Sequence, residues 1–418
     1  MKRTSLGLVL ISLLLILALA VNLTGCTKAS ATNLMEGITP NKPDLRVDLS
    51  SQNHNVTDFA VRLFKACENK GENTLISPLS VLYALAMTAN GAVGETLSQM
   101  ETVLGMTADE LNAYLYTYMN LLPSGDKYKL SLANSIWFNN DDSFTVKQDF
   151  LQTNADYYGA DIYKAPLNDQ TCKEINGWVK EETDGMITDI LKKLSPEAVM
   201  CLVNALAFEA EWAEVYEEHQ VKKDEFTKED GTKQYAEFMH GTERAYLEDE
   251  KATGFIKKYK GGKYAFVAML PKEGVSVSEY IASLDGKALN VLLSNPRCCA
   301  VHTSIPKFET VYNVEMRDVL KGMGMDKAFD SIDAEFEGLG TSDAGNIFIS
   351  SVLHKTYISV GEQGTKAGAA TVVIMDTAGM LDPQDTKEVY LDRPFVYMLV
   401  DQENNIPFFI GTMMDTGR

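Results

Sequence analysis

Apolar and polar positions along the chain predict several strands of two kinds. Residues 129–138 (KLSLANSIWF) alternate between the two classes, as a half-buried strand does. Residues 264–271 (YAFVAMLP) are almost uninterruptedly apolar, which is typical of a central strand covered on both faces. Residues 301–310 (VHTSIPKFET) and 406–413 (IPFFIGTM) also predict strands.

Helical periodicity appears in two segments of the first hundred residues. Between residues 59 and 67, apolar side chains fall on one helical face. The segment 77–91 begins with Ser77 as an N-cap and Pro78 at the first helical position, and Asn90-Gly91 ends it. Its apolar stripe consists of Leu79, Leu82, Tyr83, Ala86 and Met87. Helices and strands alternate irregularly, so we predict an α+β fold rather than a doubly wound α/β fold.

One strand-competent segment has no local partner. Residues 361–380 read GEQGTKAGAATVVIMDTAGM, and a polar run follows without a nearby strand to pair with. With a period of two, Thr365 lies on one face of this segment and Lys366 on the other. The small residues at 367–370 suit a strand that slips between two existing strands.

The N-terminus predicts export and a lipid anchor. Lys2 and Arg3 precede a long apolar run, as in a secretory signal, although a run of this length also fits a signal anchor. The run ends in Leu-Thr-Gly-Cys26, which resembles the lipobox of bacterial lipoproteins. We therefore expect residues 1–25 to be a signal peptide, Cys26 to be lipidated, and residues 26–55 to form a flexible tether. Two acyl chains on Cys26 suffice for stable membrane attachment.

Composition narrows the possible chemistry. The chain of 418 residues carries a net charge of −20, which argues against nucleic acid as a partner. Besides Cys26 there are five cysteines and no CxxC motif, so we interpret the five mostly as small buried residues. With five histidines in the chain, we expect neither a metal site nor a cofactor.

Motifs of enzymes are mostly missing from the sequence. It contains no HExxH, P-loop or GxSxG motif. Ser304-Ile305-Pro306-Lys307 matches the SxxK motif of penicillin-binding proteins, but that motif works on a helix, and here it lies in a strand-like run with no KTG after it. We therefore expect no catalytic residues, and a penicillin-binding-type hydrolase is a minor alternative.

Long segments in a fixed order resemble the serpin family of serine protease inhibitors, from about Val56 to Arg418. They are NTLISPLSVLYALAMTANGAVGETLSQM (73–100), NSIWF (134–138), LVNALAFEAEW (202–212), IPKFE (305–309), VLHKTYISVGEQGTKAGAAT (352–371) and DRPFVYMLVD (392–401). The resemblance implies a monomeric serpin domain over 56–418 with about three β-sheets and eight to nine helices. It also implies an exposed reactive-centre loop over about 362–391.

In this family the loop is bait for a protease. After cleavage it inserts into the central sheet as a new strand, and the protease is trapped as an acyl-enzyme. The resemblance thus implies a single-use inhibitor of serine endopeptidases. A cross-class inhibitor of cysteine proteases and a non-inhibitory serpin-fold binding protein are the alternatives. Non-inhibitory members typically carry bulky, charged or proline residues in the hinge, and TKAGAAT does not.

The resemblance also assigns roles residue by residue. Trp212 matches the breach, where the loop first enters the sheet. The hydrogen-bonded shutter beneath the sheet comprises Ser77, Ser80, Asn204 and His354. The hinge comprises Glu362, Gly364, Thr365, Ala367, Gly368, Ala369 and Ala370. From the residues alone, Ser77 is equally a simple helix cap, His354 a satisfied core imidazole and Trp212 an ordinary core aromatic. Two features depart from the family pattern: Gly361 stands where an acidic residue or asparagine is usual, and AFEAEW replaces a commoner aromatic and Gly-Lys pattern. Neither affects the small residues of the hinge.

The bond to be cut follows from the same resemblance. Inhibitory serpins are cleaved about fourteen residues after the hinge glycine, which allows nearly a full inserted strand. From Gly364 this places the bond at Ala378-Gly379, with Thr377, Met380 and Asp376 as alternatives. A small residue there suits an elastase- or subtilisin-like protease. With the lipid anchor, we expect an extracytoplasmic protein held at the cell membrane.

Overall fold

A computed structural model describes residues 31–44, 46–122, 125, 127–141, 143–195, 197–343, 345–365 and 385–417. Within these residues there are nine α-helices. They are α2 (Asn53–Cys67), α3 (Pro78–Ala89), α4 (Gly94–Leu104), α5 (Ala108–Leu121), α6 (Gln148–Tyr158), α7 (Asp169–Glu182), α8 (Val277–Ser283), α9 (Gly286–Ser294) and α10 (Arg317–Gly322). With three sheets, they confirm the predicted α+β class.

The first sheet has seven strands. In spatial order they are β1 (Thr32–Asn33), β5 (Asp161–Ala165), β3 (Tyr128–Asn139), β6 (Met200–Glu211), β15 (Gly364–Thr365), β14 (Ile349–Gly361) and β12 (Phe308–Glu315). Strands β6 and β14 run parallel and pair directly over most of their length. At the C-terminal ends of these two strands, β15 lies between them and is antiparallel to both.

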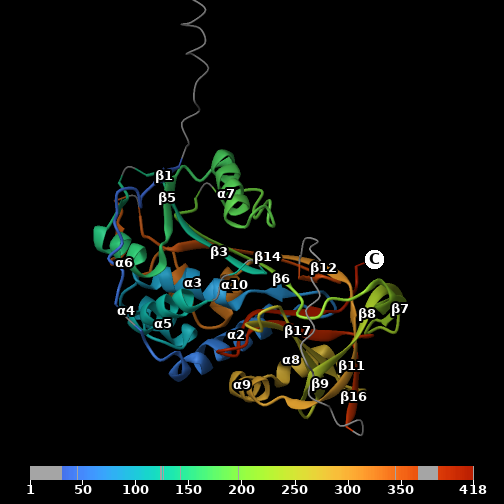
Figure 1. The fold of residues 1–418 in the computed structure, drawn as a ribbon. Coiled ribbons are helices and arrows are strands. Elements are labelled where there is room, and N and C mark those ends of the chain that lie inside the picture. Colours follow the sequence, from blue (N-terminus) through green and yellow to red (C-terminus); the bar gives the residue numbers. More distant parts are fainter. Residues whose placement is uncertain are drawn as a thin grey trace, which may run out of the picture.

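The second sheet extends from the centre of the molecule to its lower right in Figure 1. Its order is β16 (Thr386–Tyr390), β11 (Arg297–Pro306), β8 (Lys233–Glu248), β9 (Ala252–Lys258), β10 (Tyr264–Pro271), β17 (Phe395–Asp401), β18 (Ile406–Met413) and β2 (Leu75–Ile76). Strand β7 (Val221–Thr227) pairs with β8, and a third, two-stranded sheet joins β13 (Gly340–Thr341) to β4 (Thr145–Val146).

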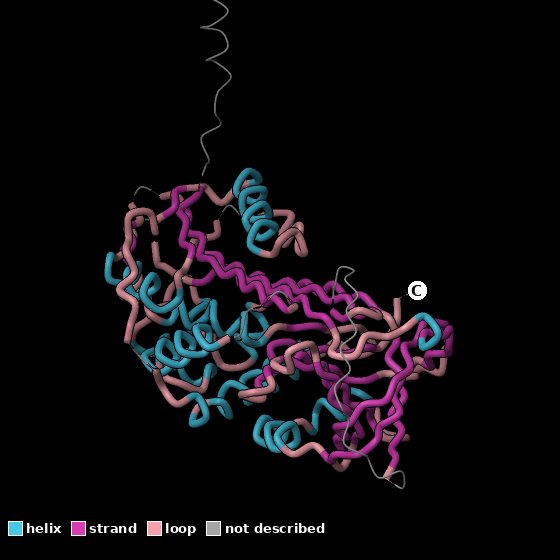
Figure 2. The backbone as a smooth tube through the Cα atoms, viewed as in Figure 1, coloured by secondary structure: helices cyan, strands magenta, loops and turns pink. Residues whose placement is uncertain are grey.

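Helices cover both faces of the first sheet (Figure 2). Helices α3–α6 gather beneath it, and α7 lies alone on its other face. The large core fills the space on the α3 side, and a smaller core, which includes Cys172 of α7 and Cys201 of β6, fills the α7 side. The central strand β6 therefore points apolar side chains to both cores, which explains its near-continuous burial.

Local signals placed several elements correctly. Strand β10 spans the predicted 264–271, and β18 spans the predicted 406–413. Ser77 caps α3, with its Oγ accepting from the Ser80 backbone N–H at 3.2 Å. All five residues of the predicted apolar stripe are buried, and so are the other seven residues of α3. The helix is enclosed on all sides because it contacts both large sheets and the neighbouring helices.

Two further expectations need correction. The single strand predicted over 301–310 is two strands, because the chain leaves the second sheet after Pro306 and joins the first at Phe308. The flexible tether expected over 26–55 does not hold for residues 31–55. There, β1 pairs with β5, the Asn41 backbone N–H donates to Asp156 Oδ1 at 2.7 Å, and α2 begins at Asn53.

Four of the five cysteines are buried, as interpreted, but Cys298 is exposed. The SxxK segment lies on β11 and the residue after it, not on a helix. Among the residues that the structure describes, no helix is both long and apolar enough to cross a bilayer.

Candidate functional site at the opening of the first sheet

The contact line between β6 and β14, which we call the seam, carries most of the residues singled out above. Below, the two strands pair directly, with His354 opposite Asn204. At the C-terminal ends of the two strands, which we call the top of the seam, Gly364 and Thr365 of β15 separate Ala210 of β6 from Val360 of β14. The seam is therefore closed at the bottom and filled by two residues of the predicted hinge at the top.

Gly364 can occupy this place because it has no side chain. Its φ is +151°, and a Cβ atom there would lie 2.0 Å from the carbonyl oxygen of Ala210. Other residues are excluded by both the backbone conformation and the close approach of β6. The sequence signal for the hinge glycine thus has a direct steric cause.

Thr365 is fully buried at the end of β15. Its hydroxyl hydrogen-bonds with the hydroxyl of Tyr259, which is also buried. The side chain therefore points into the molecule before any cleavage of the loop. Tyr259 follows β9 and was not singled out from the sequence, because no local pattern links it to a segment a hundred residues away.

Trp212 holds the turn that leads into β15. Its backbone N–H donates to the carbonyl of Gln363 and its indole Nε1–H to the carbonyl of Gly361, both at 2.8 Å. The indole ring stacks on Tyr259, with ring centroids 4.4 Å apart. The backbone N–H of Tyr216 donates to the Glu362 carbonyl at 3.0 Å. The carbonyls of residues 361–363, which lead into β15, therefore all accept hydrogen bonds from the segment 212–216.

A buried ion pair supports Trp212 from behind. The ammonium of Lys257 lies 5.3 Å from the centre of the Trp212 ring and 4.4 Å from that of Tyr216, and it binds Glu243 at 2.9 Å. Burial disfavours the charged lysine, but the attraction of Glu243 and Tyr216 outweighs it, so the pKa of Lys257 lies above its ordinary value. The cation is thus retained beneath the hinge.

Glu362 is tied to the junction between the two large sheets. Its carboxylate binds Lys307 at 2.7 Å, and Lys307 also binds Glu237 of β8 at 3.0 Å. Burial works against the charge of Glu362, yet hydrogen bonding and attraction from Lys307 lower its pKa. Lys307 is the residue at which the chain crosses from β11 to β12, a role that the SxxK motif did not indicate.

The four predicted shutter residues meet beneath the closed part of the seam. The Ser77 backbone N–H donates to Nε2 of His354 at 3.1 Å, and Ser80 Oγ donates to Oδ1 of Asn204 at 3.2 Å. Because Nε2 accepts, Nδ1 carries the hydrogen and donates to the same Oδ1 of Asn204. The cluster therefore links α3 to both strands of the seam.

We expect acid to destabilise the fold through His354. Burial lowers its pKa to about 3, whereas a histidine in an unfolded chain titrates near ~6.5. Between these values the unfolded state binds one more proton, so the free energy of unfolding falls by about 1.4 kcal/mol per pH unit as the pH drops below ~6.5. Urea unfolding at pH 7 and pH 5 should show a smaller pH dependence in His354→Gln than in the original chain. Equal dependence in both proteins would contradict this origin.

The other face of the seam is covered by α7 and the segment after it. Ile187, Ile190, Leu191 and Leu194 pack in the smaller core against residues of β3, β6 and β14. Lys355 of β14 pairs with Asp189 at 3.3 Å and also donates to its backbone carbonyl. Any strand that enters the seam must displace this cover.

Six of the predicted hinge and scissile residues lie outside the described residues. They are Ala367, Gly368, Ala369, Ala370, Ala378 and Gly379. The chain is described again from Asp385, and Thr386–Tyr390 form β16, which pairs in parallel with β11. The loop expected over 362–391 is therefore shorter at both ends, because 364–365 and 386–390 are strands.

Comparison with known proteins agrees with this geometry. The profile of the family described as "Serpin (serine protease inhibitor)" matches residues 54–416. An uncharacterized serpin-like protein of Thermococcus kodakarensis is 30% identical over 368 residues, 86% of this chain and 84% of that protein. Crystal structures of the thermophilic serpin tengpin also match. The native state has 48% identity and a TM-score of 0.88, with 92% of this chain and 100% of that chain covered. The latent state has 45% identity and a TM-score of 0.77, with 88% and 99% covered. The chain therefore belongs to the serpin family, whose members are generally protease inhibitors.

Proposed function

We propose that the protein inhibits serine endopeptidases as a single-use substrate. The protease cuts the loop between β15 and β16, the loop enters the seam as a full strand, and the acyl-enzyme is carried along and trapped. The seam residues then act as proposed from the resemblance: hinge, breach at Trp212, and shutter at His354 and its partners.

One observation carries this proposal: β15 already lies between β6 and β14. It runs antiparallel to both strands, so a continuation of the same strand would replace the parallel β6–β14 ladder by two antiparallel ones. Antiparallel pairing is slightly more stable per residue than parallel pairing. Insertion thus adds hydrogen bonds to the sheet and also replaces parallel pairing by the more stable antiparallel pairing.

The energy available is large compared with the stability of a domain. If each hydrogen bond of a new strand gains about 1 kcal/mol net, a dozen contribute on the order of 10 kcal/mol. That equals the whole unfolding free energy of a typical domain, about 5–15 kcal/mol. The arrangement with the seam closed is then maintained by a kinetic barrier. The structure is more similar to native tengpin than to latent tengpin, with TM-scores of 0.88 and 0.77, which supports the interpretation that the closed seam is the native arrangement.

The intact loop is held at both ends. At one end β15 is fixed in the first sheet, and at the other β16 pairs along five residues with β11. Directly before β16, the carboxylate of Asp385 binds two nitrogens of the Arg297 guanidinium, at 2.6 and 3.1 Å. A loop anchored in two sheets cannot extend fully into one of them. Cleavage removes this constraint, so insertion follows the cut.

Insertion has to occur during the lifetime of the acyl-enzyme, between cleavage of the peptide bond and deacylation. The protease serine oxygen bonds to the carbonyl carbon of the cleaved residue, the peptide C–N bond breaks, and the serine proton passes through the protease histidine to the new amine. Deacylation needs the same histidine and the oxyanion hole in register. Insertion that distorts this geometry before water attacks leaves the ester intact.

Incubation with a panel of purified proteases tests the proposal. We expect a complex that survives SDS with an elastase- or subtilisin-like serine protease, together with release of a C-terminal fragment. A stable complex with cysteine proteases alone would assign the cross-class alternative. Complete cleavage without any complex, for every protease in the panel, would refute trapping and favour a non-inhibitory binding protein.

We also propose that Cys26 anchors the protein to the outer side of the cell membrane. The mature chain is expected to sediment with membranes after expression in a bacterial host, because two acyl chains on Cys26 give stable attachment. In Cys26→Ser the same chain should appear in the soluble fraction. Soluble, signal-cleaved protein from the unmodified gene would exclude the anchor.

A further inference from the structure

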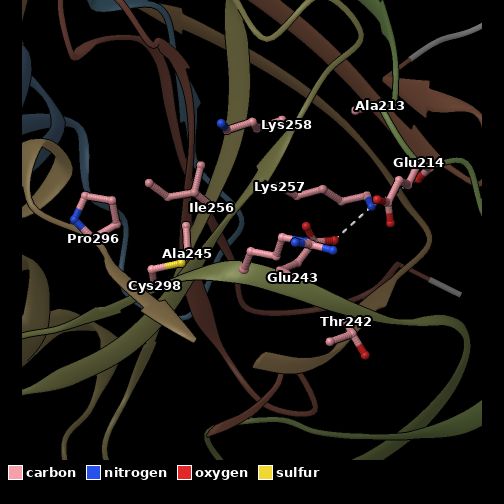
Figure 3. Close-up of a pocket in the computed structure, with 11 residues that line it drawn as sticks. Ala213, Glu214, Thr242, Glu243, Ala245, Ile256, Lys257, Lys258, Pro296 and Cys298 are labelled. Carbon is pink, nitrogen blue, oxygen red and sulfur yellow. Dashed lines mark hydrogen bonds and ion pairs between the residues drawn. The ribbon is translucent and has the colours of Figure 1, made fainter. Parts of the chain in front are cut away.

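A pocket of about 520 Å³ opens behind the breach, lined by β8, β9 and the residues around the start of β11. Its size is typical of a small-molecule site. Figure 3 shows Ile256, Pro296 and Cys298 on one side, with the Glu243–Lys257 pair and Glu214 on the other. The walls therefore offer a ligand an apolar side and a charged side.

The charges that line the pocket are unbalanced. Lys257 neutralises Glu243 across 2.9 Å, which leaves Arg244, Lys258 and Glu214. Arg244 and Lys258 are exposed, and within the described part of the chain neither forms an ion pair. Two unpaired cations against one carboxylate give the wall a net positive charge in a chain whose net charge is −20. Such a local reversal favours anions.

We propose that this pocket binds a small amphipathic organic anion, such as an aliphatic carboxylate. Its apolar part packs against Ile256 and Pro296, and its anionic group is held by Lys258 and Arg244. None of the residues that line the pocket belongs to the loop that meets the protease, and nothing in the proposed inhibition requires the pocket.

Lys257 connects this pocket to the hinge. The same side chain lines the pocket and lies over Trp212, whose indole donates to the Gly361 carbonyl. Lys257 Nζ also donates to the carbonyl of Glu214, another pocket residue, at 3.2 Å. A ligand that restrains these groups stabilises the described arrangement by mass action. Any resulting change in protease trapping rests on the proposed function, whereas binding itself does not.

Cys298 provides a reporter inside the pocket. It is the exposed member of the five cysteines in the described residues, and the others are buried. The alkylation rate of Cys298 by iodoacetamide, followed by peptide mass spectrometry on the full chain, therefore measures access to the pocket. Peptide resolution separates this signal from Cys26.

Dodecanoate is the probe, and dodecyltrimethylammonium is its control of opposite charge and equal chain length. We expect dodecanoate, below its micelle concentration, to slow alkylation of Cys298 several-fold, and the cationic control to leave the rate unchanged. Lys258→Glu should weaken protection by dodecanoate about tenfold, the effect of losing ~1.4 kcal/mol of binding free energy. Lys70→Glu, at an exposed position that does not line the pocket, should leave protection unchanged.

Several results would overturn the site. These are no protection by dodecanoate, equal protection by both amphiphiles, or protection that Lys258→Glu does not alter. Arg244→Glu provides an independent test at the second cation should Lys258→Glu fail to fold. No protease is present in these assays, so a negative result rejects the pocket without affecting the proposed inhibition. Loss of protease trapping, conversely, leaves the binding result standing.

Discussion

Thr365→Arg is expected to convert the inhibitor into an ordinary substrate. The native side chain is fully buried between β6 and β14, and its hydroxyl contacts the buried hydroxyl of Tyr259. An arginine at this place brings a charge without a counter-ion into the sheet, which costs several kcal/mol. The arginine is therefore excluded from the seam in the uncleaved variant, and insertion has to bring it in. Since each ~1.4 kcal/mol corresponds to a factor of ten, insertion slows by more than tenfold and deacylation precedes it.

The measurement is the fraction of protease recovered as an SDS-stable complex, together with the mass of the released fragment. We expect Thr365→Arg to be cut at the same bond as the original chain and to yield little complex. Thr365→Ser, which keeps the hydroxyl for Tyr259, should trap normally. Gln363→Arg adds the same charge at a half-buried position two residues earlier and should retain most of the complex. If Thr365→Arg traps as well as the original chain, the insertion mechanism is wrong.

Ala378→Arg is expected to change which protease is trapped. The fourteenth residue after Gly364 is Ala378, and residues 367–386 contain no lysine or arginine. A small side chain suits a narrow specificity pocket, whereas arginine suits a pocket with an aspartate at its base, as in trypsin. The variant should therefore lose its complex with elastase-like proteases and form one with trypsin. Both effects are expected to be large, because the residue enters the specificity pocket directly.

The C-terminal fragment released from the trapped complex identifies the bond independently. A fragment that begins at Gly379 supports the count from the hinge. Fragments that begin one residue earlier or two later would move the site to Thr377 or Met380, and one that begins at Thr377 would point to an acid-specific protease cutting after Asp376. A fragment that begins after Lys387 would overturn both the site and the specificity. Ala378→Gly controls for changes of side-chain size without charge.

The sequence predicted features that depend on local chemistry. Helix α3 was identified because a serine cap and a proline mark its start, and β10 because a long apolar run needs cover on both faces. It could not predict which strand pairs with which, since periodicity reports burial and not the partner. The run 301–310 therefore looked like one strand, although Lys307 separates two strands of different sheets.

The same limit applies to the site. Gly364, Thr365 and Trp212 were singled out through long family motifs, and the structure places them together at the top of the seam. Tyr259 and Lys257, which contact them, come from β9 and its end and carry no local signal. Residues 26–55 were interpreted as a tether because they lack periodicity, yet backbone hydrogen bonds attach Thr32–Asn33 to β5 and Asn41 to α6.

The order of strands in the seam has a consequence for synthesis on the ribosome. Strand β6 is complete at residue 211 and its parallel partner β14 at residue 361, whereas the loop is complete only where β16 begins, at residue 386. At roughly 5–20 residues per second, about 1–5 s separate the completion of β14 from the start of β16. During this interval β14 is available to β6 before the rest of the loop has been made. Vectorial translation thus favours closure of the seam first, so that the nascent chain reaches the less stable arrangement simply because its strands arrive in that order.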